Sequence, residues 1–157
     1  MRNDWKTYVR WIALAEGTGA LAGWLTRDGT KWFAQCVRKP ALTPPAAVFP
    51  IAWGILYALM GAGAARVSMG PPGEERTAAL RTFWLQLGAN FLWSILFFNL
   101  RAYGAAFLLL VILWGLIVWM TLLFAQQDRT AALLQLPYLL WVLFAGYLNL
   151  GVWTLNP

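Results

Sequence analysis

Two stretches of the sequence place aromatic and amide side chains at the spacing of a single helix face. Trp53 and Tyr57 are four residues apart in an apolar run, and Gln86, Asn90 and Trp93 repeat this spacing farther along. Residues four and seven apart lie on the same side of an α-helix. Because amides are costly to expose to an apolar solvent, this side should face other helices. Aromatic rings beside amides suit the binding of a flat, weakly polar molecule.

A third stretch near the C-terminus carries the same combination. Tyr138, Trp141, Ala145 and Asn149 occupy an arc of about 80° on a helix, and Ala145 leaves space between the rings and the amide. If the three faces converge, they enclose a cavity with aromatic walls, few hydrogen-bonding groups and almost no charge. The alternative is that these side chains only pack and hydrogen-bond the helices to one another, as in many membrane bundles.

The elements that carry these residues are too apolar for a water-soluble protein. The 157-residue chain is 61% hydrophobic and 11% charged, whereas about 25% of the residues of a soluble protein are charged. Residues 46–65, 102–125 and 131–155 contain no charged side chain, and about 20 apolar residues suffice to cross a bilayer. We therefore expect an all-α integral membrane protein, one domain over residues 1–157, that crosses a bacterial membrane several times.

The pattern of apolar runs and polar breaks predicts a bundle of five transmembrane helices. In the first loop, residues 26–45, Lys39 is followed by three prolines that stiffen the chain and end any preceding helix. We expect this loop to cover the cavity as a lid. The five predicted helices cover about residues 5–25, 46–66, 82–100, 102–125 and 130–155.

Several kinds of chemistry are excluded by what the sequence lacks. The chain has no histidine, which removes the usual ligand of haem iron and a common ligand of zinc. The single Cys36 has no disulfide partner and no histidine to activate it. We therefore expect no cofactor and no metal site. The twelve Lys and Arg residues are spread over termini and loops, which predicts contact with membrane lipid and not with nucleic acid.

Glu16 is the only ionisable side chain deep in a predicted helix. Placing such a group near the bilayer centre costs about 2.5 kcal/mol or more, so it should face protein or be protonated. A proton relay needs further titratable groups at similar depth, and the other predicted helices supply none. We expect Glu16 to have a structural or gating role outside the binding site.

Motifs in the first loop and in the second, third and fifth predicted helices occur in a consistent order and spacing. The set consists of Trp32-Phe33, Lys39-Pro40, Pro44-Pro45, Val48-Phe49, Trp53-Gly54-x-Leu56-Tyr57, Gln86-Leu87-x-x-Asn90-x-x-Trp93, Phe97-Phe98, Pro137-Tyr138-Leu139-x-Trp141 and Phe144-Ala145 with Leu148-Asn149. This set resembles the TspO/MBR family of tryptophan-rich sensory proteins and translocator proteins over nearly the whole chain. The lid departs from the family pattern, because Leu42 and Ala47 stand where the family usually has tryptophan.

The resemblance implies a five-helix bundle, commonly a homodimer, with a pocket beneath the first loop that binds porphyrins and other hydrophobic ligands. Trp53 and Trp141 match the family tryptophans that flank this pocket, and some bacterial members are reported to degrade porphyrin in light through them. The helix faces and the resemblance together predict these ligand-binding residues: Trp32, Trp53, Tyr57, Gln86, Asn90, Trp93, Tyr138, Trp141 and Ala145.

Two functions are compatible with such a site. The first is binding of a tetrapyrrole such as protoporphyrin IX for transport or stress sensing. Trp53 and Trp141 would stack on the macrocycle, while Tyr57, Gln86 and Asn90 would bond to its polar edges. The alternative is an enzyme that degrades bound porphyrin oxidatively in light, with Trp53 and Trp141 as catalytic residues. Without a histidine to ligate iron, metal-free porphyrin should be preferred over haem.

Overall fold

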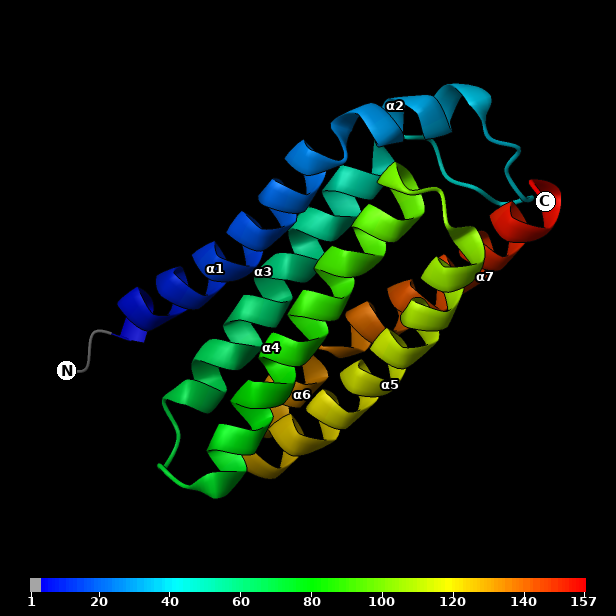
Figure 1. Cartoon of the computed structure of the whole chain (residues 1–157). Coiled ribbons are helices and arrows are strands. Elements are labelled where there is room, and N and C mark those ends of the chain that lie inside the picture. Colours follow the sequence, from blue (N-terminus) through cyan, green and yellow to red (C-terminus); the bar gives the residue numbers. More distant parts are fainter. Residues whose placement is uncertain (1–3) are drawn as a thin grey trace.

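A computed structural model of the chain describes residues 4–157, and every regular element in that range is helical. This confirms the prediction of an all-α protein. Figure 1 shows the helices as one elongated bundle. The elements are α1 (Asp4–Leu25), α2 (Arg27–Cys36), α3 (Val48–Ser68), α4 (Glu74–Ser94), the π-helix η1 (Ile95–Asn99), α5 (Tyr103–Gln127), α6 (Arg129–Leu133) and α7 (Leu136–Leu155).

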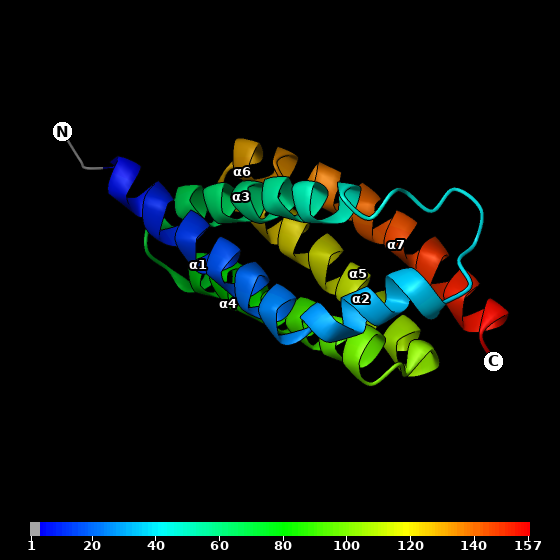
Figure 2. The same ribbon diagram turned by 90° about the horizontal axis from the view of Figure 1, so that it is seen from above.

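The long helices pack against one another in pairs along the bundle. α1 packs mainly on α3, α4 on α5, and α5 on α7. Figures 1 and 2 show α2 lying across the end at which α7 and the chain finish, while α1 begins at the opposite end. Gly61 of α3 allows close packing of α1, because a Cβ there would lie 2.5 Å from the Cα of Ile12. Such close approach is how small residues stabilise helix contacts in lipid.

The predicted number of five helices is not exact. The predicted lid loop, residues 26–45, contains the helix α2, and the third predicted helix begins at Glu74 instead of residue 82. Glu74 and Glu75 lie in the first turn of α4, where carboxylates are stabilised by the positive end of the helix dipole. The polar residues before position 82 therefore form the first turns of α4 and not a loop.

The last predicted helix is divided into α6 and α7 by a turn at Leu134 and Gln135. Pro137 follows at the second position of α7. A proline in the middle of a continuous helix would lack one N–H donor and collide with the carbonyl four residues earlier. At the start of a new helix the missing donor costs little. The break at Gln135 thus accommodates Pro137.

The C-terminal end of α4 widens into η1, which the sequence did not predict. The Leu100 N–H donates to the Ile95 carbonyl at 3.0 Å, five residues back, as in a π-helix. Arg101 then adopts a left-handed conformation with φ of 54°. This local change of register brings both Phe97 and Phe98 to the interior space described below.

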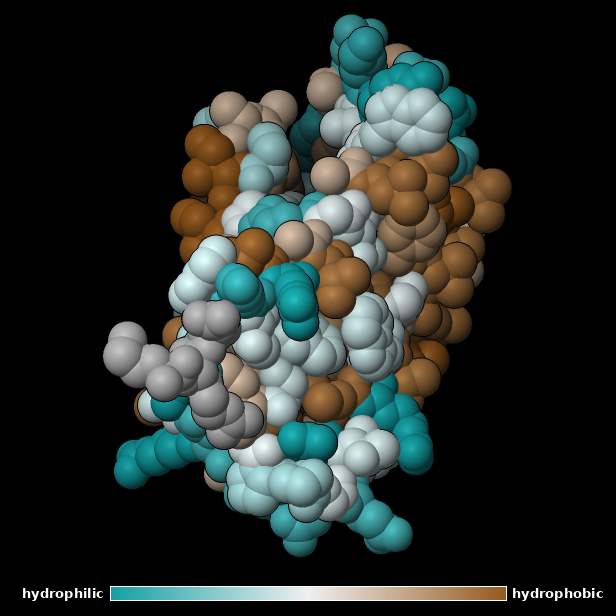
Figure 3. Space-filling model, turned by 90° about the vertical axis from the view of Figure 1, so that its left-hand side faces the viewer, coloured by the Kyte–Doolittle hydropathy of each residue, from teal (hydrophilic) through white to brown (hydrophobic). Residues whose placement is uncertain are grey.

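The outside of the bundle is rich in hydrophobic side chains. Leu108, Leu122 and Leu140 are each more than 60% exposed, and Figure 3 shows extensive hydrophobic surface on one side of the molecule. Within residues 4–157, the helices long and apolar enough to cross a membrane are α3, α5 and the segment Arg129–Leu155. An apolar surface of this extent is suited to lipid contact.

An ion pair closes the end of the bundle opposite α2. Arg66 on α3 meets Asp128 at 2.9 Å, and it also donates to the hydroxyl of Tyr8 on α1 at 3.3 Å. The Asp128 carboxylate accepts the Ala131 N–H at 3.0 Å and so caps α6. Burial acts to raise the pKa of Asp128, but the hydrogen bonds from Arg66 and Ala131 outweigh it and lower that pKa. One carboxylate therefore ties α3 to the α5–α6 junction.

Candidate ligand-binding site

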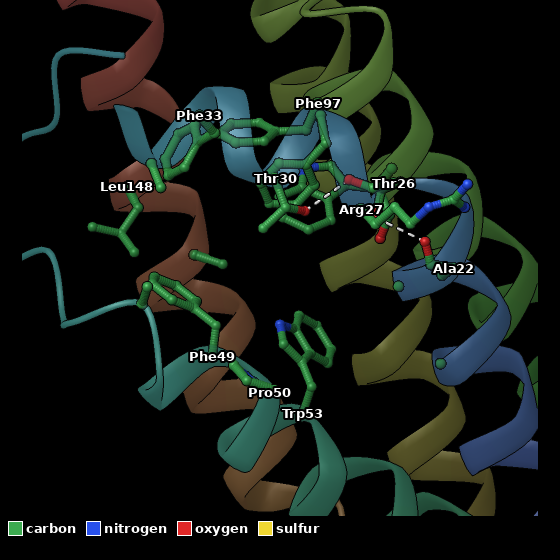
Figure 4. Close-up of a pocket in the computed structure, with 18 of the residues that line it drawn as sticks. Ala22, Thr26, Arg27, Thr30, Phe33, Phe49, Pro50, Trp53, Phe97 and Leu148 are labelled. Atoms are coloured by element: carbon green, nitrogen blue, oxygen red, sulfur yellow. Dashed lines mark hydrogen bonds between the residues drawn. The ribbon is translucent and has the colours of Figure 1, made fainter. Parts of the chain in front are cut away.

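A cavity of about 820 Å³ lies beneath α2 and the loop that follows it. Its walls come from α1, α3, the α4–η1 segment and α7, and most of the lining side chains are apolar. Figure 4 shows Thr26, Thr30 and Phe33 above this space, with Phe49 and Trp53 rising into it from α3. The volume lies within the range of pockets that bind small molecules, which is about 300–1,000 Å³.

One wall of the cavity is a cluster of aromatic rings on α3 and α7. The Trp53 ring lies 6.4 Å from the Trp141 ring and 5.6 Å from the Tyr57 ring, measured between centroids. Phe49 packs edge-on against Trp141 at 6.0 Å. Because these rings hold one another at edge-to-face and tilted angles, they form a rigid apolar surface against which a planar molecule can stack.

The structure brings five of the nine predicted ligand-binding residues to the cavity wall. They come from three different elements, α3, α4 and α7, so the predicted convergence of helix faces is present for these residues. The five are Trp53, Tyr57, Trp93, Trp141 and Ala145. The other four predicted residues, Trp32, Gln86, Asn90 and Tyr138, lie off the wall.

Gln86, Asn90 and Tyr138 hydrogen-bond to one another inside the bundle. The Tyr138 hydroxyl donates to Gln86 Oε1 at 2.7 Å, and Asn90 Nδ2 donates to the Tyr138 hydroxyl at 2.8 Å. The Tyr57 hydroxyl joins the network by donating to Asn90 Oδ1 at 3.5 Å. All three predicted residues are almost completely buried, where an amide without a partner is costly. Their polar atoms are therefore occupied by helix-to-helix bonds and do not face the cavity.

Trp32 does not line the cavity and instead contacts the turn that follows η1. The guanidinium carbon of Arg101 lies 3.6 Å from its ring centroid, a close cation–π contact. Nearby, Asn99 Nδ2 donates to the Leu25 carbonyl at 3.0 Å. Gly29 touches the backbone of Phe98 so closely that no side chain would fit there. These contacts hold the start of α2 on η1 and the following turn.

The loop after α2 is fastened to α7. Asn156 bonds to both backbone groups of Arg38, accepting from its N–H at 3.1 Å and donating to its carbonyl at 2.8 Å. The Tyr147 hydroxyl donates to the Ala41 carbonyl at 2.7 Å. Leu42, at the tip, is 81% exposed and has a left-handed backbone with φ of 69°. The loop and α2 thus roof the cavity, and Leu42 does not line it.

The comparison with known proteins agrees with the motifs and with this arrangement. The family model described as TspO/MBR family matches residues 11–154. The chain belongs to the TspO/MBR family. Together with the apolar helices α3, α5 and Arg129–Leu155, this membership assigns the protein to a membrane.

Relatives of the chain come from bacteria and animals. It is 41% identical over 128 residues to "Protein CrtK" of Rhodobacter capsulatus, a match that covers 80% of this chain and 79% of that protein. It is 36% identical over 147 residues to "Tryptophan-rich protein TspO" of Chlorobaculum tepidum, covering 93% of each chain. It is 33% identical over 159 residues to "Translocator protein" of Bos taurus, covering 99% of this chain and 94% of the relative.

The predicted ligand-binding residues did not include every aromatic side chain on the wall, although the missing ones belong to the TspO/MBR motifs. Phe33, Phe49, Phe97 and Phe98 also line the cavity, and the ring of Phe33 packs on those of Phe97 and Phe98 at 5.4 and 5.5 Å. Phe97 shares the helix face of Gln86 and Asn90, so spacing was a usable signal for it. Phe98 is consecutive with Phe97 and reaches the same space only because of η1.

Charged side chains line the cavity unevenly. Arg27, Lys31 and Lys39 belong to α2 and the loop, whereas Glu16 is the only acidic lining residue and comes from the middle of α1. Contrary to the expectation that Glu16 lies outside the site, its side chain therefore belongs to the wall.

Lys39 caps α2 by donating to the Ala34 and Val37 carbonyls, each at 3.1 Å. Within residues 4–157, no acidic, cysteine or histidine cluster could hold a metal ion.

Proposed function

We propose that this TspO/MBR protein binds a metal-free tetrapyrrole such as protoporphyrin IX in the cavity, for transport or stress sensing. The observation that carries the proposal is the pair of rings of Trp53 and Trp141, 6.4 Å apart at the wall of a space of about 820 Å³. Stacking and burial of an apolar macrocycle against such rings supply most of the affinity expected for a weakly polar guest.

The charges of the roof indicate how the guest would lie. Lys31, Lys39 and Arg27 line the α2 side of the cavity, so the carboxylates of the porphyrin would meet them there and its apolar part would point toward Trp53. This arrangement replaces the expected bonds to Gln86 and Asn90, whose polar atoms are held in the buried network. Charge-assisted contacts of this kind orient a ligand more than they tighten it.

The test is a titration of purified protein with protoporphyrin IX in neutral detergent. Porphyrin absorbance and tryptophan fluorescence should change saturably at micromolar ligand, and haem should bind more weakly. Trp53→Ala should weaken binding by about three- to tenfold through loss of stacking. Trp5, which is 63% exposed and does not line the cavity, provides the control Trp5→Ala. Unsaturable partitioning, equal in both variants and in empty micelles, would refute the proposal.

We also propose that the chain crosses a bacterial membrane five times through α1, α3, α4, α5 and α7 and that it forms a homodimer. Support comes from the apolar outer surface and from family membership. The mass of the detergent-solubilised protein, measured by light scattering with the detergent contribution subtracted, distinguishes a dimer from a monomer of 17.6 kDa.

A second candidate function, light-dependent oxidative degradation of the bound porphyrin, rests on the contact between the Trp53 and Trp141 rings. Adjacent indoles at the wall are placed to exchange an electron with an excited guest, with dioxygen as the oxidant. Illumination in air should then bleach bound porphyrin into a defined product in the wild-type protein. Trp53→Phe and Trp141→Phe should slow this reaction. An unchanged porphyrin spectrum would contradict degradation and would leave binding as the one function supported.

A further inference from the structure

Glu16 is the one carboxylate among the residues that line the cavity. It lies near the middle of α1 and begins a stripe of small residues, Ala20 and Gly23, that leads along the helix toward the roof. Thr26, at the roof, follows Glu16 by ten residues, which corresponds to about 15 Å of helix axis. The cavity therefore has a negative group deep in its wall and positive groups at its roof.

No cation of residues 4–157 forms a salt bridge with Glu16, since Arg66 and Asp128 make the ion pair of the described chain. The lysines and arginine of the cavity wall belong to the roof. If α1 crosses the membrane as proposed, a carboxylate in the middle of this helix is costly unless it is paired or neutral. A ligand that brings its own positive charge to this position would offset that cost.

The surroundings of Glu16 are those that favour an organic cation. The ring of Tyr57 lies directly against Gly19, one turn along α1 from Glu16, and the Trp53 ring is 5.6 Å from that of Tyr57. Aromatic faces attract alkylated ammonium groups, and the attraction grows when water is excluded. A carboxylate next to such rings can hold a cation that has a large apolar body.

The cavity has open space for such a body about two helical turns from Glu16 along α1. A Cβ built on Gly23 or on Gly54 would meet no atom within 4 Å, and both glycines line the cavity. Figure 3, which views the side of the bundle that carries α1, shows a hollow near the upper end of this face. A lipophilic cation with its nitrogen at Glu16 therefore has open space for its apolar body along the small side chains of α1.

We propose that the cavity binds lipophilic cations, flat aromatic amines or quaternary ammonium compounds, with the positive nitrogen at Glu16 and the rings against Trp53 and Tyr57. The inference uses the cavity of the proposed function but does not depend on porphyrin as its ligand. It assigns Glu16 as the residue that selects for positive charge.

The experiment compares two probes with the same planar aromatic body, one carrying a trimethylammonium group and the other the neutral tert-butyl group of the same shape. Dissociation constants are measured by equilibrium dialysis in neutral detergent, with empty micelles as the partition blank. Wild-type protein should bind the cation about tenfold more tightly than the neutral probe. Glu16→Gln should reduce this ratio to about one, whereas Glu16→Asp should retain most of it. Glu74→Gln makes the same charge change on an exposed residue outside the cavity and should leave the ratio unchanged.

Protoporphyrin IX is titrated into the same preparations to separate the two ideas. Porphyrin affinity should stay within about twofold in Glu16→Gln, because the porphyrin carboxylates are proposed to meet the positive charges of the roof, and Thr26 at the roof lies about 15 Å of helix axis from Glu16. A ratio near one in the wild type, or a ratio that Glu16→Gln leaves unchanged, overturns the assignment of Glu16 even if porphyrin binds. A cation preference lost in Glu16→Gln supports it even if porphyrin does not bind, in which case only the proposed function fails.

Discussion

Whether a polar side chain serves the ligand or the fold depends on its partners inside the bundle. Asn149 lines the cavity, yet it accepts from Trp93 Nε1 at 3.0 Å and donates to the Tyr103 carbonyl at 2.9 Å, so it joins three elements. The buried Nε1 of Trp141, in contrast, has no hydrogen-bond partner within residues 4–157. A buried donor without a partner is costly, so this indole N–H lowers the stability of the fold and is not a group that a guest in the cavity reaches.

At Asn90 we predict a loss of stability without a loss of ligand affinity. Asn90→Leu removes the donor to Tyr138 and the acceptor for Tyr57 and should lower the free energy of unfolding by about 1 kcal/mol, a magnitude typical of polar contacts between membrane helices. Thermal unfolding in detergent measures this change. Porphyrin affinity should remain within about twofold of wild type, and a tenfold loss would show that Asn90 contacts the ligand after all.

At Asp128 we predict a contribution to stability that depends on pH. Because its pKa is lowered in the folded protein, the contribution is present above the ordinary aspartate pKa of about 3.9 and is lost as the pH falls through the lower folded-state pKa. Asp128→Asn keeps a good helix cap but removes the charge, and Arg66 is partly exposed, so the loss at pH 7 should be only about 0.5 kcal/mol. Unfolding curves of the two proteins should converge below pH 4; a constant difference would contradict the assignment.

At the scale of elements, α3 and α5 could be predicted closely because their apolar runs carry no charge, but α2 could not. α2 is short and has no buried residue, and Asp28, Gly29 and Lys31 look like loop residues in sequence. Its position depends on tertiary contacts, chiefly those of Trp32 with Arg101 and of Gly29 with Phe98.

The orientation of polar side chains was equally beyond the sequence. The spacing of Gln86 and Asn90 correctly assigned them to a buried helix face. Spacing does not reveal whether the hydrogen-bond partner of a buried amide is a bound ligand or another side chain. Here the partner is the Tyr138 hydroxyl, which accepts from Asn90 and donates to Gln86. Likewise, the extra backbone residue that makes η1 leaves no periodic signal in the sequence. Phe98 was therefore recognised as part of a motif, but its place in the cavity wall was not predicted.

The contact between Trp32 and Arg101 should control how fast a ligand leaves. Arg101→Gln removes the charge over the Trp32 ring, a cation–π contact of about 0.5–1 kcal/mol when exposed. If opening of α2 limits release, the porphyrin dissociation rate should rise about two- to fivefold. Stopped-flow displacement measures this rate.

A double-mutant cycle supplies the control for this prediction. Trp32→Leu should produce the same acceleration, and the Trp32→Leu/Arg101→Gln double variant should be no faster than either single variant, because both changes break one contact. Additive effects would mean that Trp32 and Arg101 act on the ligand independently and that their contact does not hold α2 closed.

At the scale of the whole molecule, the two ends of the bundle differ in what they can do. One end is tied by the ion pair of Arg66 and Asp128 and by the bond from Arg66 to Tyr8. The other end holds the cavity, whose roof is fastened by a few hydrogen bonds, one cation–π contact and the packing of Phe33 on Phe97 and Phe98. We therefore expect ligand exchange at the α2 end, where the roof can move while the long helices remain packed.

Five membrane crossings predict which loops share a side of the membrane. Cys36 lies on α2, between the proposed first and second crossings, and its side chain is exposed. Glu75, exposed at the start of α4, follows the second crossing. In intact cells or sealed vesicles, a membrane-impermeant maleimide should therefore reach these two positions from opposite sides. The second position is tested with Glu75→Cys in a Cys36→Ser background, with detergent-permeabilised samples as the control for reactivity. Labelling of both positions from the same side would mean that α3 does not cross the membrane, and the bundle would then have to lie differently in the lipid.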